Sequence, residues 1–298
     1  MKQLLIWGII ILILSGLSVS LGRKKRPEQN GQSPAPKEIV IAAGGDIACF
    51  QNWKTDEDSC KQKETAALIE QINPEAVLIL GDLQYNPPAF TSWLGYEESW
   101  GKFKNISYPA IGNHEYDLPG GKGYWDYWGE KAGERGKGWY SFDLGEWHIA
   151  AVNSNCGEVG CGKESEQVRW LDGDLTASKK ACKLAFMHHP RYSSGKSHGN
   201  TLAIKDMWEI LDAGGVDVVL AGHEHLYERL KSGNIREFIV GTGGRSLYDF
   251  GNPKTGSEAR ISDSFGVLKM VLKEGGYEWE FVSEDGEAKD RGIENCTP

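Results

Sequence analysis

Residues 216–225 have the sequence VDVVLAGHEH, an apolar run that predicts a short buried strand and ends in two histidines. In an extended backbone, residues two apart point the same way, so we expect His223 and His225 to face one site. Imidazole nitrogen is a common ligand of zinc, iron and manganese. The segment therefore predicts metal ligands at the end of a buried strand.

Four other short apolar runs also end in potential metal ligands. The runs that predict strands are residues 39–43, 76–80, 108–111 and 183–187. The side chains that follow them, in chain order, are Asp46, Asp82 with Tyr85, Asn113 with His114, and His188. Ligand sites of α/β sheets collect at the carboxyl ends of strands, so we expect these side chains to converge.

Helical patterns separate several of these strands. They cover residues 61–72, 92–103, 164–177 and 201–213. Residues 117–137, rich in Gly, Trp and Tyr, are expected to form a long loop over the site, and residues 139–143 and 147–153 a hairpin. The tail alternates apolar and polar residues, which predicts antiparallel strands. The whole pattern predicts a single α/β domain over residues 39–298, with sheets inside and helices outside.

The potential ligands are more than one ion needs. Two carboxylates, a phenol, an amide oxygen and three imidazoles suffice for two ions that share one carboxylate. Two-ion sites suit in-line displacement at phosphorus, because one ion activates water and both stabilise the entering and leaving oxygens. The residue types therefore indicate hydrolysis of a phosphate ester by metal-activated water.

Five motifs carry a resemblance to a known family. They are GD at 45–46, GDLQY at 81–85, GNHE at 112–115, MHHP at 187–190 and GHEHLYER at 222–229. Each motif is weak alone, but five in this order, each after a predicted strand, form a specific pattern. From residue 39 to the tail, the chain resembles the calcineurin-like metallophosphoesterase superfamily, and within it the purple acid phosphatases and their small bacterial-type relatives. The resemblance implies a sandwich of two mixed β-sheets flanked by helices, acting as a metal-dependent phosphoric ester hydrolase.

The resemblance also implies a role for each matching residue. The first ion would be held by Asp46, Asp82, Tyr85 and His225. The second ion would be held by Asp82, Asn113, His188 and His223, with Asp82 bridging the two. His114 would lie near the phosphate oxygens and the leaving group, and His198, matched only by spacing, is a candidate proton donor.

The first motif departs from the pattern of many superfamily members. Those members have Asp-x-His, with the histidine on the first ion, whereas this chain has Ala48 at that position. The resemblance implies that Tyr85 compensates, as in the purple phosphatases. A phenolate is a hard anionic donor that favours Fe(III), and a trivalent ion acidifies bound water strongly. We therefore expect Fe(III) with a divalent ion, which is Zn, Mn or Fe.

Other polar residues near the motifs leave alternatives open. His189 is expected to be an outward neighbour of His188 or to lie one layer outside the ligands, with the alternative that the two histidines exchange roles. His148 is expected to be a packed or surface histidine. Arg191 and Arg245 are interpreted either as phosphate contacts or as ordinary ion-pair partners.

Two acidic residues stand directly beside predicted functional histidines. Glu115 and Glu224 are expected to lie one layer outside the ligands, where they would orient these histidines, or to start helices. The Trp and Tyr side chains between Tyr116 and Tyr140 are expected to pack rather than to stack on a base.

The charge balance bears on the partners. The net charge is −9 at pH 7 and the sequence pI is about 5.4. Broad nucleic-acid binding needs a basic face, so the composition argues against it. The expected partner is a small phosphorylated substrate, and the sequence does not predict the oligomeric state.

The N-terminus differs from the rest of the chain. Residues 1–21 are predicted to be a signal peptide or a membrane anchor, and the polar, Pro-containing residues 22–38 a flexible linker. The RKKR cluster at 23–26 leaves open an anchor with the domain on the cytoplasmic side, and it offers a contact for anionic lipid.

The cysteines favour an oxidising compartment. Six are present, an even number with close spacings, which predicts a secreted or membrane-anchored protein outside the cytoplasm. The separations suggest the pairs Cys49–Cys60, Cys156–Cys161 and Cys182–Cys296, while other pairings stay open.

Three functions fit these features. The first is dinuclear-metal-dependent hydrolysis of phosphate monoesters, as in an acid phosphatase. The second is a phosphodiesterase or nucleotidase on the same metal centre. The third is a surface binding module that kept the fold without catalysis, although none of the seven expected ligands is missing.

Overall fold

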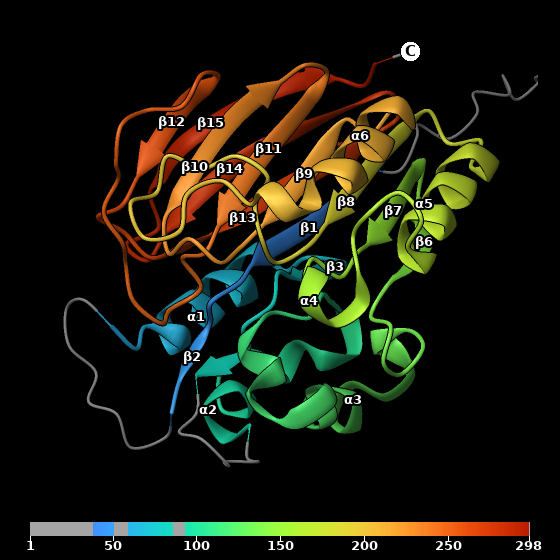
Figure 1. Ribbon diagram of the computed structural model, residues 1–298. Coiled ribbons are helices and arrows are strands. Elements are labelled where there is room, and N and C mark those ends of the chain that lie inside the picture. Colours follow the sequence, from blue (N-terminus) through green and yellow to red (C-terminus); the bar gives the residue numbers. More distant parts are fainter. Residues whose placement is uncertain (1–37, 51–58, 86–92, 298) are drawn as a thin grey trace, which may run out of the picture. The chain divides into compact units, whose positions relative to one another are not determined.

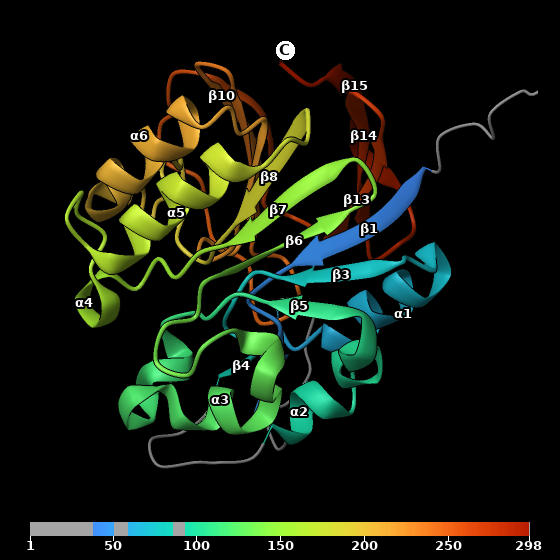
Figure 2. The same ribbon diagram turned by 90° about the vertical axis from the view of Figure 1, so that its right-hand side faces the viewer.

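The computed structural model describes residues 38–50, 59–85 and 93–297. Two β-sheets pack face to face, and helices cover both outer faces (Figures 1 and 2). This is the predicted αββα sandwich, so the expected fold class is confirmed. The segments predicted to be a signal peptide or anchor and a linker, apart from Glu38, lie outside the described residues.

The first sheet is mixed and has the strand order β15-β14-β13-β1-β3-β5. Its parallel part consists of β1 (Ile39–Gly44), β3 (Ala76–Ile79) and β5 (Ser107–Pro109). Its antiparallel part consists of β13 (Gly266–Lys273), β14 (Gly276–Ser283) and β15 (Ala288–Asn295). The predicted antiparallel tail is therefore confirmed.

The second sheet is also mixed, with the order β12-β10-β11-β9-β8-β7-β6. Its parallel strands are β7 (Trp147–Ala151), β8 (Cys182–Phe186), β9 (Val218–Ala221) and β11 (Ile235–Val240). Its antiparallel additions are β6 (Tyr140–Leu144), β10 (Tyr227–Ser232) and β12 (Ser257–Ile261). Strands β6 and β7 form the expected hairpin.

The main core fills the space between the two sheets. It combines alternate residues of both, such as Ile41 and Leu78 from the first sheet and Phe186, Leu220 and Phe238 from the second. Burying a large apolar side chain stabilises the fold by about 1.5–3 kcal/mol, so this shared layer holds the strand ends in fixed positions.

Each outer face has its own helices. Figure 2 shows α5 (Glu166–Ala177) and α6 (Lys205–Ala213) along the second sheet, where they bury Leu171 and Leu211. Helix α5 begins at Ser165, whose side chain accepts a hydrogen bond from the Val168 N–H and contributes about 1 kcal/mol. On the first sheet, α1 (Gln62–Ile72) ends at Asn73 in the left-handed conformation, which asparagine tolerates.

Two expected elements differ from the structure. The predicted helix over residues 92–103 is broken into α2 (Leu94–Glu97) and a 3-10 helix, η1 (Trp100–Ile106), and residue 92 lies outside the described part. The predicted long loop over residues 117–137 is wrong. That region contains α3 (Lys122–Trp128), whose Tyr124, Trp125 and Trp128 are buried, so the density of glycines concealed a short packed helix.

Several short elements complete the chain. They are β2 (Ala48–Cys49), β4 (Gln84–Tyr85), α4 (Cys156–Val159), η2 (His114–Asp117), η3 (Pro119–Gly121), η4 (Gly129–Ala132) and η5 (Leu202–Ile204). Strands β2 and β4 pair in parallel, Cys49 opposite Tyr85, and so hold the first and second motifs side by side.

The three suggested disulfides are confirmed. They join Cys49 to Cys60, Cys156 to Cys161 and Cys182 to Cys296. The last one ties the end of the chain to β8. Within the described residues, every helix is too short or too polar to traverse a lipid bilayer.

Candidate metal centre

The seven predicted ligand side chains come together where strands of both sheets end. Asp46, Asp82 and Asn113 follow β1, β3 and β5 of the first sheet, and His188 and His223 follow β8 and β9 of the second. Tyr85 and His225 lie a few residues further along two of these loops. The face-to-face packing of the sheets therefore brings the five motifs to one site.

The first group is centred on the phenol of Tyr85. Its oxygen lies 2.7 Å from Asp46 Oδ1, 3.0 Å from Asp82 Oδ2 and 2.8 Å from His225 Nε2. His225 Nε2 is also 3.2 Å from Asp46 Oδ1. These are the four residues that the family resemblance assigned to the first ion.

The second group is centred on the imidazole of His188. Its Nε2 lies 3.0 Å from Asn113 Oδ1, 3.3 Å from Asp82 Oδ2 and 3.2 Å from His223 Nδ1. These four residues are the ones assigned to the second ion. Asp82 Oδ2 takes part in both groups, which is the position expected of a bridging carboxylate.

The first group has fewer protons than its oxygen atoms need, which suits a bound cation. A phenol has one proton, so Tyr85 can satisfy only one of the two carboxylate oxygens that lie beside it. Asp46 and Asp82 are fully buried, and water does not solvate the remaining charge. Burial, followed by the charges of Asp46 and Asp82, raises the pKa of Tyr85. A cation among these atoms would offset the charge and favour the phenolate.

The second group also fits a cation. The carbonyl oxygen of Leu80 lies 2.8 Å from His188 Nδ1 and can only accept, so Nδ1 carries hydrogen and Nε2 faces the group. Burial alone would lower the pKa of His188, but the charge of Asp82 raises it to about 9, so a proton at Nε2 does what a metal ion would do. Burial and the neighbouring imidazoles lower the pKa of His223, which leaves that ring neutral.

The spacing of the donor atoms in both groups also fits bound cations. Ligand distances of about 2.0–2.2 Å place neighbouring donors around one ion about 3 Å apart. The distances within both groups are 2.7–3.3 Å. The residues present therefore fit two cations with mixed oxygen and nitrogen ligands.

The backbone is left-handed at three of these positions. The φ angles are 58° at Asp46, 50° at Asp82 and 70° at His223. Such conformations cost about 1–3 kcal/mol and collect at functional sites. The expected extended backbone at His223 is therefore wrong: both histidines reach the site because the chain turns sharply after β9, not because they alternate along a strand.

The motif glycines permit close approach. A Cβ on Gly112 would lie 2.2 Å from Asp82 Oδ1, and one on Gly222 would lie 2.7 Å from Asp46 Oδ2. Asp46 Oδ2 in turn accepts a hydrogen bond of 2.7 Å from the His223 N–H. Gly112 and Gly222, each at the start of a ligand motif, thus let neighbouring loops touch.

The two acidic neighbours act on the backbone. Glu115 accepts hydrogen bonds from the N–H groups of Asp82, Leu83 and Gly112. Glu224 accepts from the N–H groups of His198 and Gly199. Both lie one layer outside the donor groups, as expected, but neither is hydrogen-bonded to the imidazole beside it.

The two predicted catalytic histidines flank the donor groups. The His114 ring lies 4.3 Å from the Tyr85 ring, and its Nδ1 is 2.9 Å from Asp117 Oδ2. Burial lowers the pKa of His114, but Asp82 and Asp117 raise it overall. The exposed His198 lies with its ring 4.2 Å from that of His223.

His189 lies one layer outside the donor groups, which is the second of the two positions expected for it, and it does not point outward. Its ring centre is 4.3 Å from that of His223, and one of its nitrogens lies within 4.8 Å of the ligand atoms of His188 and His223. Its Nδ1 is 2.8 Å from Ser154 Oγ, whereas His188 turns into the donor group. In the sequence, only the position of His189 directly after His188 indicated that it could lie here.

Three other candidates lie outside the donor groups. His148 is packed between Asp143 and Asp174, as expected. The Arg245 guanidinium lies 5.2 Å from the Tyr85 ring centre, and that of Arg191 lies against Tyr192.

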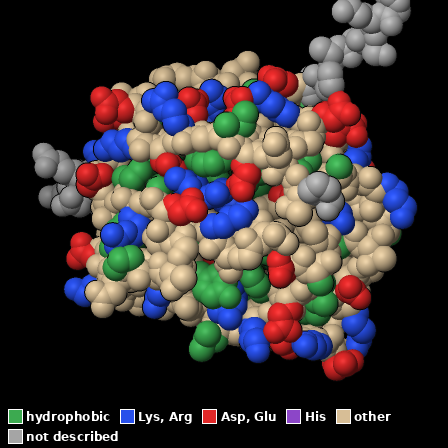
Figure 3. Space-filling view, turned by 90° about the horizontal axis from the view of Figure 1, so that it is seen from above, with side chains coloured by type: hydrophobic (Ala, Val, Ile, Leu, Met, Phe, Trp, Pro, Cys, Tyr) green, Lys and Arg blue, Asp and Glu red, His purple; other side chains and the backbone are tan. Residues whose placement is uncertain are grey.

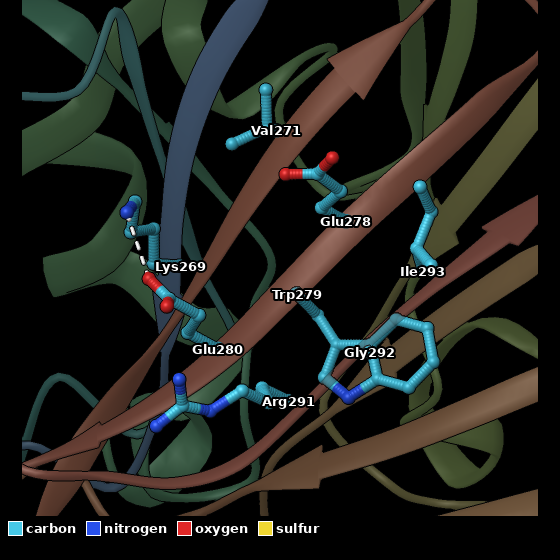
Figure 4. Close-up of a pocket in the computed structure, with 8 residues that line it drawn as sticks. All are labelled: Lys269, Val271, Glu278, Trp279, Glu280, Arg291, Gly292 and Ile293. Atoms are coloured by element: carbon cyan, nitrogen blue, oxygen red, sulfur yellow. Dashed lines mark hydrogen bonds and ion pairs between the residues drawn. The ribbon is translucent and has the colours of Figure 1, made fainter.

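Two hollows differ in their relation to this site. One of 380 Å³ adjoins it and is lined by Asn113, Tyr116, Ser154, Asn155, Cys156, Gly157, Glu158, His189, Thr201 and Ala203. The other, of 310 Å³, is formed by β13, β14 and β15 and is drawn in Figure 4, with the Lys269–Glu280 ion pair at one side and Ile293 at the other. None of the predicted site residues lines the second hollow.

Comparisons with known proteins identify the family that the chain resembles. Residues 39–227 match the calcineurin-like phosphoesterase family. Purple acid phosphatase 23 of Arabidopsis thaliana is 27% identical over 228 residues, which cover 64% of this chain and 47% of the plant protein. The chain thus spans about half the length of the curated relatives that it matches.

Solved structures share the fold. Purple acid phosphatase PPD1 from yellow lupin seeds has a TM-score of 0.71 at 21% identity, covering 87% of this chain and 54% of its own. GAP50, the anchor in the inner membrane complex of Plasmodium, has a TM-score of 0.67 at 16% identity, covering 88% and 90%. At these identities the likeness is one of fold.

Proposed function

The chain belongs to the calcineurin-like phosphoesterase family, and we propose that it hydrolyses phosphate monoesters at a centre of two metal ions. The observation that carries the proposal is the position of Asp82 Oδ2, 3.0 Å from the Tyr85 oxygen and 3.3 Å from His188 Nε2. One buried carboxylate oxygen that adjoins two separate donor groups suits a pair of cations better than a single one.

The donor types support Fe(III) with a divalent ion. Asp46, Asp82, Tyr85 and His225 would hold Fe(III), because a phenolate and two carboxylates are hard anionic donors. Asp82, Asn113, His188 and His223 would hold Zn, Mn or Fe as the divalent ion. When bound, the two cations supply a nucleophile from water at mildly acidic pH and stabilise charge on the phosphate oxygens.

His114 is suited to contact the substrate. Its side chain is 35% exposed, and its Nε2 lies 4.0 Å from Asp82 Oδ2. Asp117 holds Nδ1, so Nε2 is the nitrogen left to face a phosphate oxygen or the leaving group. The raised pKa of His114 favours an imidazolium at mildly acidic pH, which can donate that proton.

The adjoining hollow is suited to hold the alcohol part of the substrate. Asn113, a proposed ligand, forms one part of its wall, and Glu158 is the acidic side chain among the described residues that line it. Among the residues that the structure describes, no lysine or arginine lines it. A neutral or positively charged alcohol therefore suits this hollow better than one carrying a further phosphate.

The partner is a small phosphorylated molecule rather than a nucleic acid. The net charge of −9 opposes polyanion binding, and on the face shown in Figure 3 acidic and basic side chains are interspersed without one basic patch. Three disulfides support a location in an oxidising compartment, outside the cytoplasm. Residues 1–21 would provide either the export signal or a tether.

A substrate panel with metal analysis tests the proposal. Purified protein should contain two metal ions per chain and should hydrolyse a nitrophenyl monoester faster than the matching bis-ester. Faster cleavage of the bis-ester would make it a phosphodiesterase. Bound metal without turnover of any ester would favour a binding module.

A further inference from the structure

We propose that Glu224 is a positioning residue that holds His198 beside the metal centre for protonation of the leaving group. The inference rests on the proposed phosphatase function and extends it to Glu224, which stands in the sequence between the proposed ligands His223 and His225. It starts from the segment 191–199, which links β8 to the following helices and belongs to no helix or named strand.

Three buried carboxylates hold the backbone of this segment. Glu237 accepts from the N–H groups of Arg191, at 2.7 Å, and Tyr192, at 3.2 Å. Glu228 accepts from the Ser194 N–H at 2.7 Å. These two acids, which are fully buried, fix the part of the segment that lies far from His198.

Glu224 holds the part that carries His198. Its Oε1 accepts hydrogen bonds from the N–H groups of His198, at 2.7 Å, and Gly199, at 2.5 Å. Glu224 is fully buried, and its Oε2 has no hydrogen-bond partner among the described residues. Two backbone N–H groups that share one buried carboxyl oxygen hold this part of the loop in place.

The loop is closely fitted around the carboxylate. A Cβ on Gly195 would lie 2.3–2.5 Å from three atoms of the Glu224 carboxylate. No larger residue fits at that position without moving the loop or the acid. Because of this fit, a change at Glu224 or Gly195 should displace the segment.

The His198 side chain needs such support. It is exposed, and its contacts are with rings: His223 at 4.2 Å and Tyr248 at 5.9 Å between ring centres. An exposed side chain keeps one position only if its backbone is held. Glu224 therefore acts on His198 through the main chain, while its neighbours in sequence, His223 and His225, face the donor groups.

The chemical consequence concerns the leaving group. Water attacks phosphorus, the bond from phosphorus to the ester oxygen breaks, and the departing oxygen takes the proton that a ring nitrogen of His198 donates, which gives the alcohol. The proton released by the attacking water passes to solvent, from which His198 is protonated again. Esters of weakly acidic alcohols need this proton, whereas esters of strongly acidic phenols do not.

The test compares two substrates in the metal-loaded protein. Glu224→Met should lower kcat on glycerol phosphate about 100-fold, with a much smaller loss on dinitrophenyl phosphate and unchanged metal content. Glu224→Gln, which keeps an acceptor oxygen, should largely restore the ratio of the two rates. Glu237→Gln, at the far end of the segment, should lower stability without changing this ratio.

Two further variants complete the test. His198→Ala should produce the same selective loss, and combining it with Glu224→Met should add little, because both remove one function. Gly195→Ala displaces the loop without altering a residue between ligands and should reproduce the pattern. Hydrogen exchange at residues 198 and 199 should rise in the Glu224→Met protein.

The outcomes separate the two proposals. A wild-type protein that hydrolyses neither substrate overturns the phosphatase function. If the wild type is active, two results overturn the positioning role alone. In the first, Glu224→Met and Gly195→Ala slow both substrates equally. In the second, the losses in kcat from Glu224→Met and His198→Ala multiply in the double variant.

Discussion

The Nε2 atom of His225 lies 2.8 Å from the phenolic oxygen of Tyr85, although 140 positions separate the two residues in the chain. Tyr85 follows a strand of the first sheet and His225 follows a strand of the second. The contact therefore joins the two halves of the sandwich at the proposed metal centre, and it gives the first prediction.

Replacing Tyr85 with phenylalanine should abolish a visible phenolate-to-iron absorption band in iron-loaded protein. The change removes the anionic oxygen between Asp46 and Asp82, so metal affinity should fall about 10–100-fold. Absorption spectra and metal titration of both proteins measure this. A band that survives the substitution would show that another residue supplies the phenolate.

Removing the metals should destabilise the folded protein. Without cations, Asp46 and Asp82 stay buried next to Tyr85 with one hydroxyl proton between them. Metal at a thousand times its Kd stabilises by about 4 kcal/mol, which corresponds to a fall in Tm on the order of 10 °C after chelation. Thermal unfolding with and without chelator checks this, and equal Tm values would argue against a metal centre.

Replacing His114 with alanine should lower kcat about 100-fold while metal content stays near wild type. The reason is that His114 flanks the donor groups, with its ring 4.3 Å from that of Tyr85, but lies in neither of them. Steady-state kinetics and metal analysis on one preparation separate the two effects. Loss of metal in this variant would mean that His114 is a ligand.

Replacing Glu158 with lysine should shift the choice of substrate. Glu158 and Asn113 line the same hollow, and none of its described lining residues is a lysine or an arginine. The kcat/KM ratio for phosphoethanolamine over a phosphorylated carboxylic acid should fall about tenfold, because the charge at the hollow is reversed. Glu130→Lys, in η4 and outside the hollow, is the control. An equal ratio in all three proteins would place the alcohol elsewhere.

Replacing His148 with glutamine should reduce stability at acidic but not at alkaline pH. The hydrogen bond to Asp174 is the main cause that raises the pKa of His148, burial opposes it, and Asp143 adds to it. A raised pKa means that the contribution is complete below the unfolded value of about 6.5 and is lost as pH rises through the folded value. Because Asp143 is half exposed, the effect should be no more than about 1 kcal/mol. Urea unfolding at about pH 6 and pH 9 measures it.

The sequence predicted the strands and the meeting of the motifs because both depend on local pattern. Runs such as residues 76–80 and 184–187 are continuously apolar since both faces of those strands are buried. Helix α3 was missed because Gly120, Gly121, Gly123 and Gly129 suggest a loop, whereas its Tyr and Trp side chains gain stability only from tertiary packing.

Other features depend on contacts between distant residues. The turn at His223 is held by Asp46, 177 positions away, and no pattern within residues 216–225 predicts it. The hydrogen bonds that Glu224 accepts from the N–H groups of His198 and Gly199 join two loops that the sequence separates by 25 residues or more. The placement of His189 beside His223 likewise follows from the packing of β8 against β9.

The bond between Cys182 and Cys296 closes a covalent ring with a separation of 114 residues. His188, His198, His223 and His225 all lie inside that ring. A protease that cut the exposed main chain near Lys196 would therefore release nothing: the two fragments would stay attached to each other, migrate as one band, and separate only after a thiol reagent had opened the ring.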